Sequence, residues 1–278
     1  MDAETPKAVE LNLPQAFLLL ATNDKDGKPE VPVFALRTTV AGAILAELDL
    51  IGAIGLEGKH VKATGTAPKT DFQHELDLIR GKSRPHTPKQ WVSMLEGRAE
   101  VQRVYEGMVS LGIVEHVGAK HLGRFRTVRY PEKDHGPEDA LLKKIEAALN
   151  GATTDARAPA PTATDAAAPD AAAPDAGKPG VQTPDSPTTD AGAAVAGAKE
   201  DMAPGAGTPD AGKPAAKVPD ARTTALIALL QAAGLFGKLF PAADRSWSSE
   251  LSRDFWPSRA VEDELRLIRL AEEEAATL

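Results

Sequence analysis

The chain has 278 residues, a net charge of −8 and no cysteine, which excludes a disulfide framework, a thiolate nucleophile and a cysteine metal site. Most of the acidic excess lies in residues 151–221, which contain 10 acidic and 5 basic residues, so the rest of the chain is nearly neutral and nucleic-acid binding is disfavoured. The first residues have no basic segment followed by an apolar one, so no secretory signal is expected and we predict a cytoplasmic protein.

The N-terminal part of the chain predicts short helices separated by turns. Asn12, Pro14 and Gln15 have the pattern of a helix start. Asn12 can cap the helix, Pro14 is tolerated in the first turn, and the side chain of Gln15 can reach back to the capping residue. Apolar residues recur every three or four positions from 35 to 51, which predicts a helix ended by Gly52. Further helices are expected at 70–81, 87–95, 99–111 and 137–149, and in the C-terminal part at 244–255 and 258–275, with Pro257 between the last two.

Two small β-hairpins are predicted between these helices. The first pairs 53–57 with 60–64 around Gly58. The second pairs 113–117 with 122–130. The predicted fold class is therefore mainly helical, with one or two small β-hairpins.

The second hairpin is strongly basic, because no acidic residue occurs from 119 to 131. Its candidate cations for an anionic headgroup are Lys120, Arg124, Arg126 and Arg129. Each positive charge near an anionic membrane contributes about 1 kcal/mol to the free energy of membrane binding. The alternative is an ordinary solvated strand edge, where Lys and Arg prevent pairing with other chains.

Residues 151–221 differ in composition from the rest of the chain. They contain no aromatic residue and repeat Pro-Asp-Ala four times, so they cannot bury enough apolar surface to offset chain entropy and should be disordered. The run that follows, 222–240, is apolar on all sides and carries no charge between Arg222 and Lys238. Its 15 uncharged residues are fewer than the ~20 of a membrane span, which predicts a buried core helix.

A buried helix needs partners that the C-terminal part alone cannot supply. The remaining partners must come from residues 1–150, across the low-complexity tract. We therefore predict one domain formed by 1–150 and 222–278, with 151–221 as a disordered linker inserted in a loop.

No catalytic or metal constellation is evident. The chain has no nucleophile elbow and no paired-carboxylate motif, and Glu47 and Asp49 are predicted to lie on an outward helix face. The six histidines form no tight pair at metal-ligand spacing. His116 and His121 flank the turn of the second hairpin and are predicted to be solvated. We therefore predict a non-enzymatic protein without a metal or cofactor.

Several motifs resemble, in order and spacing, the Golgi phosphoprotein 3 family. The matching stretches are 11–20, 24–27, 42–50, 90–95 and 220–230, with Arg253 in a basic C-terminal segment. The resemblance covers about 10–150 and 220–270, and it implies a mainly helical fold in which amphipathic helices wrap a core bundle. It also implies a protruding hairpin, here 113–130, that is used in self-association.

The resemblance implies a peripheral membrane adaptor that binds phosphatidylinositol 4-phosphate and the cytosolic tails of Golgi glycosyltransferases. The family's headgroup pocket uses a tryptophan, a basic residue and two arginines. The corresponding positions here hold Pro32, Ala41, Arg98 and Val101. Only Arg98 matches, and Arg103 and Arg37 lie near enough to substitute. Because the pocket is incompletely matched, we expect the basic hairpin to carry binding to anionic lipid, with Arg98 as a minor contributor.

A nucleic-acid-binding module is the alternative from a different class. The helix at 99–111, followed by the basic hairpin, resembles a helix with a wing. A helix that reads bases needs Arg, Lys, Asn or Gln on its outer face. The outward residues here include Glu100, Gln102, Arg103 and Glu106. This acidic balance favours the membrane adaptor.

Overall fold

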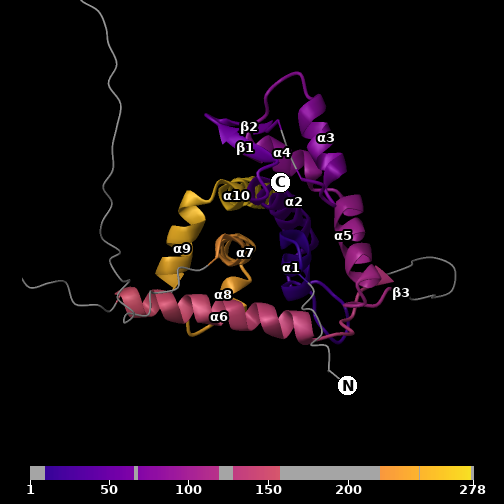
Figure 1. Ribbon diagram of the computed structural model, residues 1–278, viewed down its shortest axis with the longest axis vertical. Coiled ribbons are helices and arrows are strands. Elements are labelled where there is room, and N and C mark those ends of the chain that lie inside the picture. The colour runs from indigo at the N-terminus through magenta and orange to yellow at the C-terminus, as the bar shows by residue number, and fades with distance from the viewer. Residues whose placement is uncertain (1–9, 66–67, 119–127, 157–219, 244, 277–278) are drawn as a thin grey trace, which may run out of the picture. The chain divides into compact units, whose positions relative to one another are not determined.

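The computed structural model describes residues 10–65, 68–118, 128–156, 220–243 and 245–276 (Figure 1). These residues form a mainly helical fold with two small antiparallel hairpins, as predicted. The helices are α1 (Leu13–Leu20), α2 (Val33–Leu50), α3 (Gln73–Gly81), α4 (Pro88–Leu95), α5 (Arg98–Ser110), α6 (Gly136–Ala156), α7 (Ala221–Ala232), α8 (Phe236–Leu239), α9 (Arg245–Asp254) and α10 (Trp256–Ala276). The strands are β1 (Ile54–Glu57), β2 (His60–Ala63), β3 (Val117–Gly118) and β4 (Val128–Arg129). Within the described ranges, no helix is long and apolar enough to cross a bilayer.

The described segments on both sides of the gap at 157–219 pack as one compact unit around α7. Figure 1 shows α7 (orange) enclosed by α1 and α2, by α9 and α10, and by α6. Its side chains that are at most 2 % exposed include Leu226, Ile227, Leu229 and Leu230. The prediction of a buried core helix in the C-terminal part is therefore confirmed.

Capping side chains begin several helices. Asn12 Oδ1 accepts a hydrogen bond from Gln15 N (3.0 Å), and the Gln15 side chain accepts one from Asn12 N (3.1 Å), as predicted. The same reciprocal pattern joins Thr87 and Gln90 at the start of α4. Asp220 accepts a backbone hydrogen bond (2.8 Å) at the start of α7. Each such cap contributes about 1 kcal/mol, and the cap at Asp220 fixes the point at which the chain enters the core.

The prediction of one helix over 222–240 is wrong in one respect, because the helix breaks. Gly234 has a φ of 76°, a left-handed conformation that glycine adopts readily at a helix C-terminus. Leu235 N then donates back to Leu230 O (2.9 Å), and the short helix α8 follows. Phe236 on α8 is fully buried, so the apolar pattern continues across the break.

Two other helix boundaries differ from the prediction. Pro257 does not separate two helices but lies in the first turn of α10, where a missing backbone N–H leaves no helical hydrogen bond unmade. α6 continues to Ala156, past the predicted end at Leu149 and into the range predicted as linker. The predicted limits of the linker and of the two flanking parts of the domain stay predictions.

Both hairpins form close to their predicted positions. β1 and β2 pair around the turn at Gly58, with Ile54 opposite Ala63. β3 and β4 pair with Val117 opposite Arg129. The second hairpin is described only at its base, because residues 119–127 lie outside the described residues.

The prediction that Glu47 faces solvent is wrong. Its side chain is 7 % exposed, and both of its oxygens accept hydrogen bonds from Arg222 of α7 (2.7 and 3.0 Å). Leu13 N at the start of α1 also donates to it (2.8 Å). Asp49, two residues further along α2, is half-buried and accepts a hydrogen bond from Trp256 Nε1 (3.2 Å). These two carboxylates on α2 therefore connect it to α1, α7 and α10.

Candidate functional site

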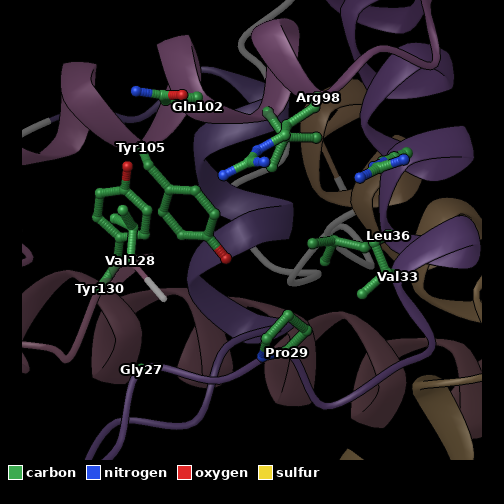
Figure 2. A pocket seen from close by; sticks show the side chains of 11 residues that line it. Gly27, Pro29, Val33, Leu36, Arg98, Gln102, Tyr105, Val128 and Tyr130 are labelled. Atoms are coloured by element: carbon green, nitrogen blue, oxygen red, sulfur yellow. The ribbon is translucent and has the colours of Figure 1, made fainter. Parts of the chain in front are cut away.

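A pocket opens between α2, α5, the loop that joins α1 to α2, and the strand β4 (Figure 2). Its volume is about 180 Å³. The residues that line it are Gly27, Pro29, Val33, Leu36, Arg37, Arg98, Val101, Gln102, Tyr105, Val128 and Tyr130. Segments that are distant in the sequence thus meet at one place on the surface.

The loop between α1 and α2 forms one side of the pocket. Asn23 Oδ1 accepts hydrogen bonds from two backbone N–H groups within the loop (both 3.2 Å). Gly27 has a φ of 64°, and a Cβ at this position would lie 2.5 Å from the backbone nitrogens of Tyr130 and Pro131. Because no side chain fits there, the loop packs directly against the backbone that follows β4.

Two stacked tyrosines form the adjoining wall. The rings of Tyr105 and Tyr130 are nearly parallel, with centroids 4.1 Å apart, and Figure 2 shows them side by side. The Tyr105 hydroxyl hydrogen-bonds Thr22 Oγ1 (2.6 Å), and the Tyr130 hydroxyl donates to Glu106 Oε1 (3.2 Å). Burial is the largest cause that raises the pKa of each tyrosine to about 12, so both are neutral at physiological pH. They form a rigid, uncharged aromatic wall.

Two arginines supply positive charge to this pocket. Arg98 is the first residue of α5 and is exposed, whereas Arg37 lies on α2 and is half-buried. Among the residues that the structure describes, neither guanidinium forms an ion pair or a hydrogen bond. A cation that has no protein carboxylate beside it is available for an anionic ligand.

The headgroup residues predicted from the family pattern divide between this pocket and other places. Arg98, Arg37 and Val101 line the pocket together. Arg103 lies elsewhere on α5 and forms an ion pair with Glu75, whose side chain is fully buried. Ala41 is completely buried within α2, so its position has no access to a ligand.

The predicted cations of the second hairpin lie at its base or beyond the described residues. Arg129 is half-buried on β4, and its Nε has no hydrogen-bond partner among the described residues. Lys120, Arg124 and Arg126 fall within 119–127, outside the described residues.

Sequence reasoning missed the aromatic and loop parts of the pocket. The ranges predicted for the helix, 99–111, and for the second strand of the hairpin, 122–130, contain Tyr105 and Tyr130 but do not indicate that the two meet. Their stacking brings the base of the hairpin against α5, and a contact of this kind leaves no periodic signal. Gly27 belongs to a stretch that matches the family pattern, 24–27, but the sequence does not indicate its close approach to another segment.

Gly27→Ala is expected to destabilise the protein by about 2–4 kcal/mol, because the left-handed conformation and the backbone contact both oppose a Cβ. Gly52→Ala is the matched control, since Gly52 has a φ of 71° but nothing within 4 Å of the added atom. It should cost only about 1–2 kcal/mol. Urea unfolding of the two variants measures the difference, and equal costs would show that the contact at Gly27 contributes nothing.

Comparison with known proteins agrees with this architecture. A sequence profile of the Golgi phosphoprotein 3 (GPP34) family matches residues 13–268, which run from the start of α1 into α10. A search of curated proteins gives no match. The family match spans nearly the whole chain and includes every segment that lines the pocket. It confirms the resemblance seen in the sequence: the chain belongs to the Golgi phosphoprotein 3 (GPP34) family.

Proposed function

We propose that the protein is a non-catalytic peripheral membrane adaptor that binds the phosphate-bearing headgroup of an anionic lipid, such as phosphatidylinositol 4-phosphate, in the pocket between α2 and α5. The observation that carries the proposal is the pair of cations there, Arg37 and Arg98, which have no ion-pair partner among the described residues. A guanidinium group binds phosphate through two parallel charge-assisted hydrogen bonds. Membership of the family supports an adaptor role of this general kind.

Apolar residues at the mouth of the pocket support its placement against a bilayer. Val33 is 53 % exposed, and Pro32 beside it is exposed as well. An apolar rim of this kind can enter the headgroup region of a membrane while the arginines meet the phosphate. A cavity of about 180 Å³ is too small to enclose acyl chains, so these would stay in the bilayer.

The pocket changes which arginines are expected to contribute most to lipid binding. The sequence favoured diffuse attraction by the basic hairpin, with Arg98 as a minor contributor. The juxtaposition of Arg98 and Arg37 supports a localised headgroup site, to which hairpin cations add a salt-sensitive contribution. Self-association through 113–130 and binding of protein tails are further parts of the proposed adaptor function.

Arg98→Ser is expected to weaken binding to vesicles containing phosphatidylinositol 4-phosphate at least tenfold, because a charge-assisted phosphate contact contributes about 1.5–3 kcal/mol. Arg269→Ser, which removes an exposed cation on α10, is the matched control and should bind normally. Sedimentation with phosphatidylserine vesicles of equal surface charge distinguishes a headgroup pocket from general attraction.

A second variant tests the hairpin directly. Replacement of Arg124, Arg126 and Arg129 by Ser should reduce binding mainly at low salt, because diffuse attraction is screened over about 8–10 Å. If this variant loses all binding while Arg98→Ser keeps it, the pocket is not the lipid site. Displacement of the protein from vesicles by duplex DNA would favour the nucleic-acid alternative instead.

A further inference from the structure

Four potential metal ligands gather beside the loop that joins α1 to α2. Asp24, Glu132, His135 and Glu138 each offer one ligand atom, and these atoms all lie within 4.8 Å of one another. They come from three segments: the loop itself, the stretch that follows β4, and the first turn of α6. None of them lines the pocket proposed for lipid.

The backbone holds these segments together independently of the four side chains. Glu132 N donates a hydrogen bond to Asp24 O (2.9 Å), and Asp139 N donates to His135 O (3.1 Å). Ile113 O accepts hydrogen bonds from the two backbone N–H groups after Glu132 (2.8 and 3.1 Å). Backbone hydrogen bonds therefore fix the positions of the segments that carry the cluster.

The carboxylate of Glu132 is buried without being satisfied. Its side chain is 3 % exposed, and its Oε2 accepts a hydrogen bond from His135 Nδ1. Its Oε1 is inaccessible to solvent and accepts no hydrogen bond from an N–H or hydroxyl group of the described residues, and the carboxyl group of Glu138 lies beside this carboxylate. Two adjoining carboxylates, one of them buried, are costly when both are ionised, and a bound cation would compensate them.

The charge of the cluster indicates a cation as its ligand. The cluster contains three acidic side chains and one imidazole, and Lys133, which follows Glu132, forms an ion pair with Glu115 instead (3.7 Å). A bound positive ion would offset the mutual repulsion of the carboxylates gathered here.

We propose that Asp24, Glu132, His135 and Glu138 form a binding site for a divalent metal ion. Three carboxylate oxygens and one imidazole nitrogen suit a first-row cation such as Mn²⁺ or Zn²⁺ better than Ca²⁺, which prefers oxygen ligands alone. Ligands of one ion lie about 3 Å apart, given metal–ligand distances of about 2.1 Å. The side chains of Asp24 and His135 are exposed and can move the short distance that this requires.

The role of the ion would be structural and not catalytic. Asp24 precedes Gly27, which packs on Tyr130, and Glu132 follows Tyr130 by two positions. A metal bound here would fasten the loop between α1 and α2 to the N-terminus of α6. It would thereby stabilise the outer edge of the pocket whether or not that pocket binds lipid.

Titration of the full-length chain, free of a histidine tag and stripped with EDTA, tests the site. Mn²⁺ and Zn²⁺ are each expected to bind with a stoichiometry of one by calorimetry. At about 100 times the dissociation constant, they should raise the melting temperature by roughly 5–10 °C. Mg²⁺ and Ca²⁺ should give smaller shifts at equal concentration.

Variants distinguish this site from metal bound elsewhere. Glu132→Gln and Glu138→Gln should each weaken Mn²⁺ binding at least tenfold and remove the rise in melting temperature. Asp139→Asn is the matched control, because it removes a negative charge from the same helical turn but no ligand. It should leave Mn²⁺ binding unchanged.

Folding of the variants can be verified without metal. Glu138→Gln keeps the size and polarity of the side chain, so its metal-free melting temperature should stay close to that of the unmodified chain. The proposal is overturned if neither Mn²⁺ nor Zn²⁺ binds with a stoichiometry of one. It is also overturned if both glutamine variants bind Mn²⁺ as tightly as Asp139→Asn does.

Discussion

Leu230→Asp is expected to abolish cooperative folding. Leu230 is fully buried on α7, which lies at the centre of the core. An unpaired carboxylate there costs several kcal/mol, and the lost leucine side chain costs about 2–5 kcal/mol more. Together these approach the ~5–15 kcal/mol by which a whole domain is stable. Thermal unfolding followed by circular dichroism should show no sharp transition.

The same substitution at an exposed leucine controls for the effect of a new charge. Leu267 on α10 is 45 % exposed, so Leu267→Asp should shift the melting temperature only slightly. Leu229→Asp should behave like Leu230→Asp, because Leu229 is equally buried. A Leu230→Asp protein that unfolds sharply at the normal temperature would show that α7 faces solvent or a partner in solution.

Arg222→Met is expected to reduce the free energy of unfolding by about 2–4 kcal/mol. The substitution keeps much of the apolar stem but removes both hydrogen bonds to Glu47. Glu47 would then hold a buried negative charge whose remaining partner is Leu13 N. Urea unfolding measures the loss, and Arg269→Met on the exposed face of α10 should be nearly neutral.

A double variant separates the ion pair from simple loss of packing. Glu47→Gln removes the buried charge, so Glu47→Gln combined with Arg222→Met should be more stable than Arg222→Met alone. Strict additivity of the two single changes would contradict this expectation, because it would mean that the two side chains do not interact.

Local sequence patterns predicted local structure well in this chain. The reciprocal cap of Asn12 and Gln15 and the hairpin turn at Gly58 depend only on neighbouring residues, and both are observed. The buried α7 was predictable because its apolar residues cover all sides of a helix. Its break at Gly234 was harder to predict, since a glycine within an apolar run can also be tolerated inside a helix.

Long-range pairing explains the predictions that failed. Glu47 was assigned to the solvent face because a carboxylate on a helix usually lies there. Its partner Arg222 is 175 positions away in the sequence, and no local pattern indicates that the two meet. Buried charges of this kind become predictable only when the tertiary contact is known.

The candidate sites were predictable only in part for the same reason. Arg98 was found through the family pattern, but its proximity to Arg37 depends on the packing of α5 against α2. Glu132, His135 and Glu138 recur every three positions, which resembles one face of a helix. α6 begins only at Gly136, so it is the approach of the preceding loop, with Asp24, that creates the cluster.

The central position of α7 has a consequence for how the protein is synthesised. α1 and α2 leave the ribosome long before α7, and a chain grows at only about 5–20 residues per second. For several seconds, while the segment between Ala156 and Ala221 is translated, the earlier helices therefore expose the apolar faces that α7 will cover. The nascent chain in this interval is expected to be a substrate for ribosome-associated chaperones, and the emergence of α7 is the event that permits folding.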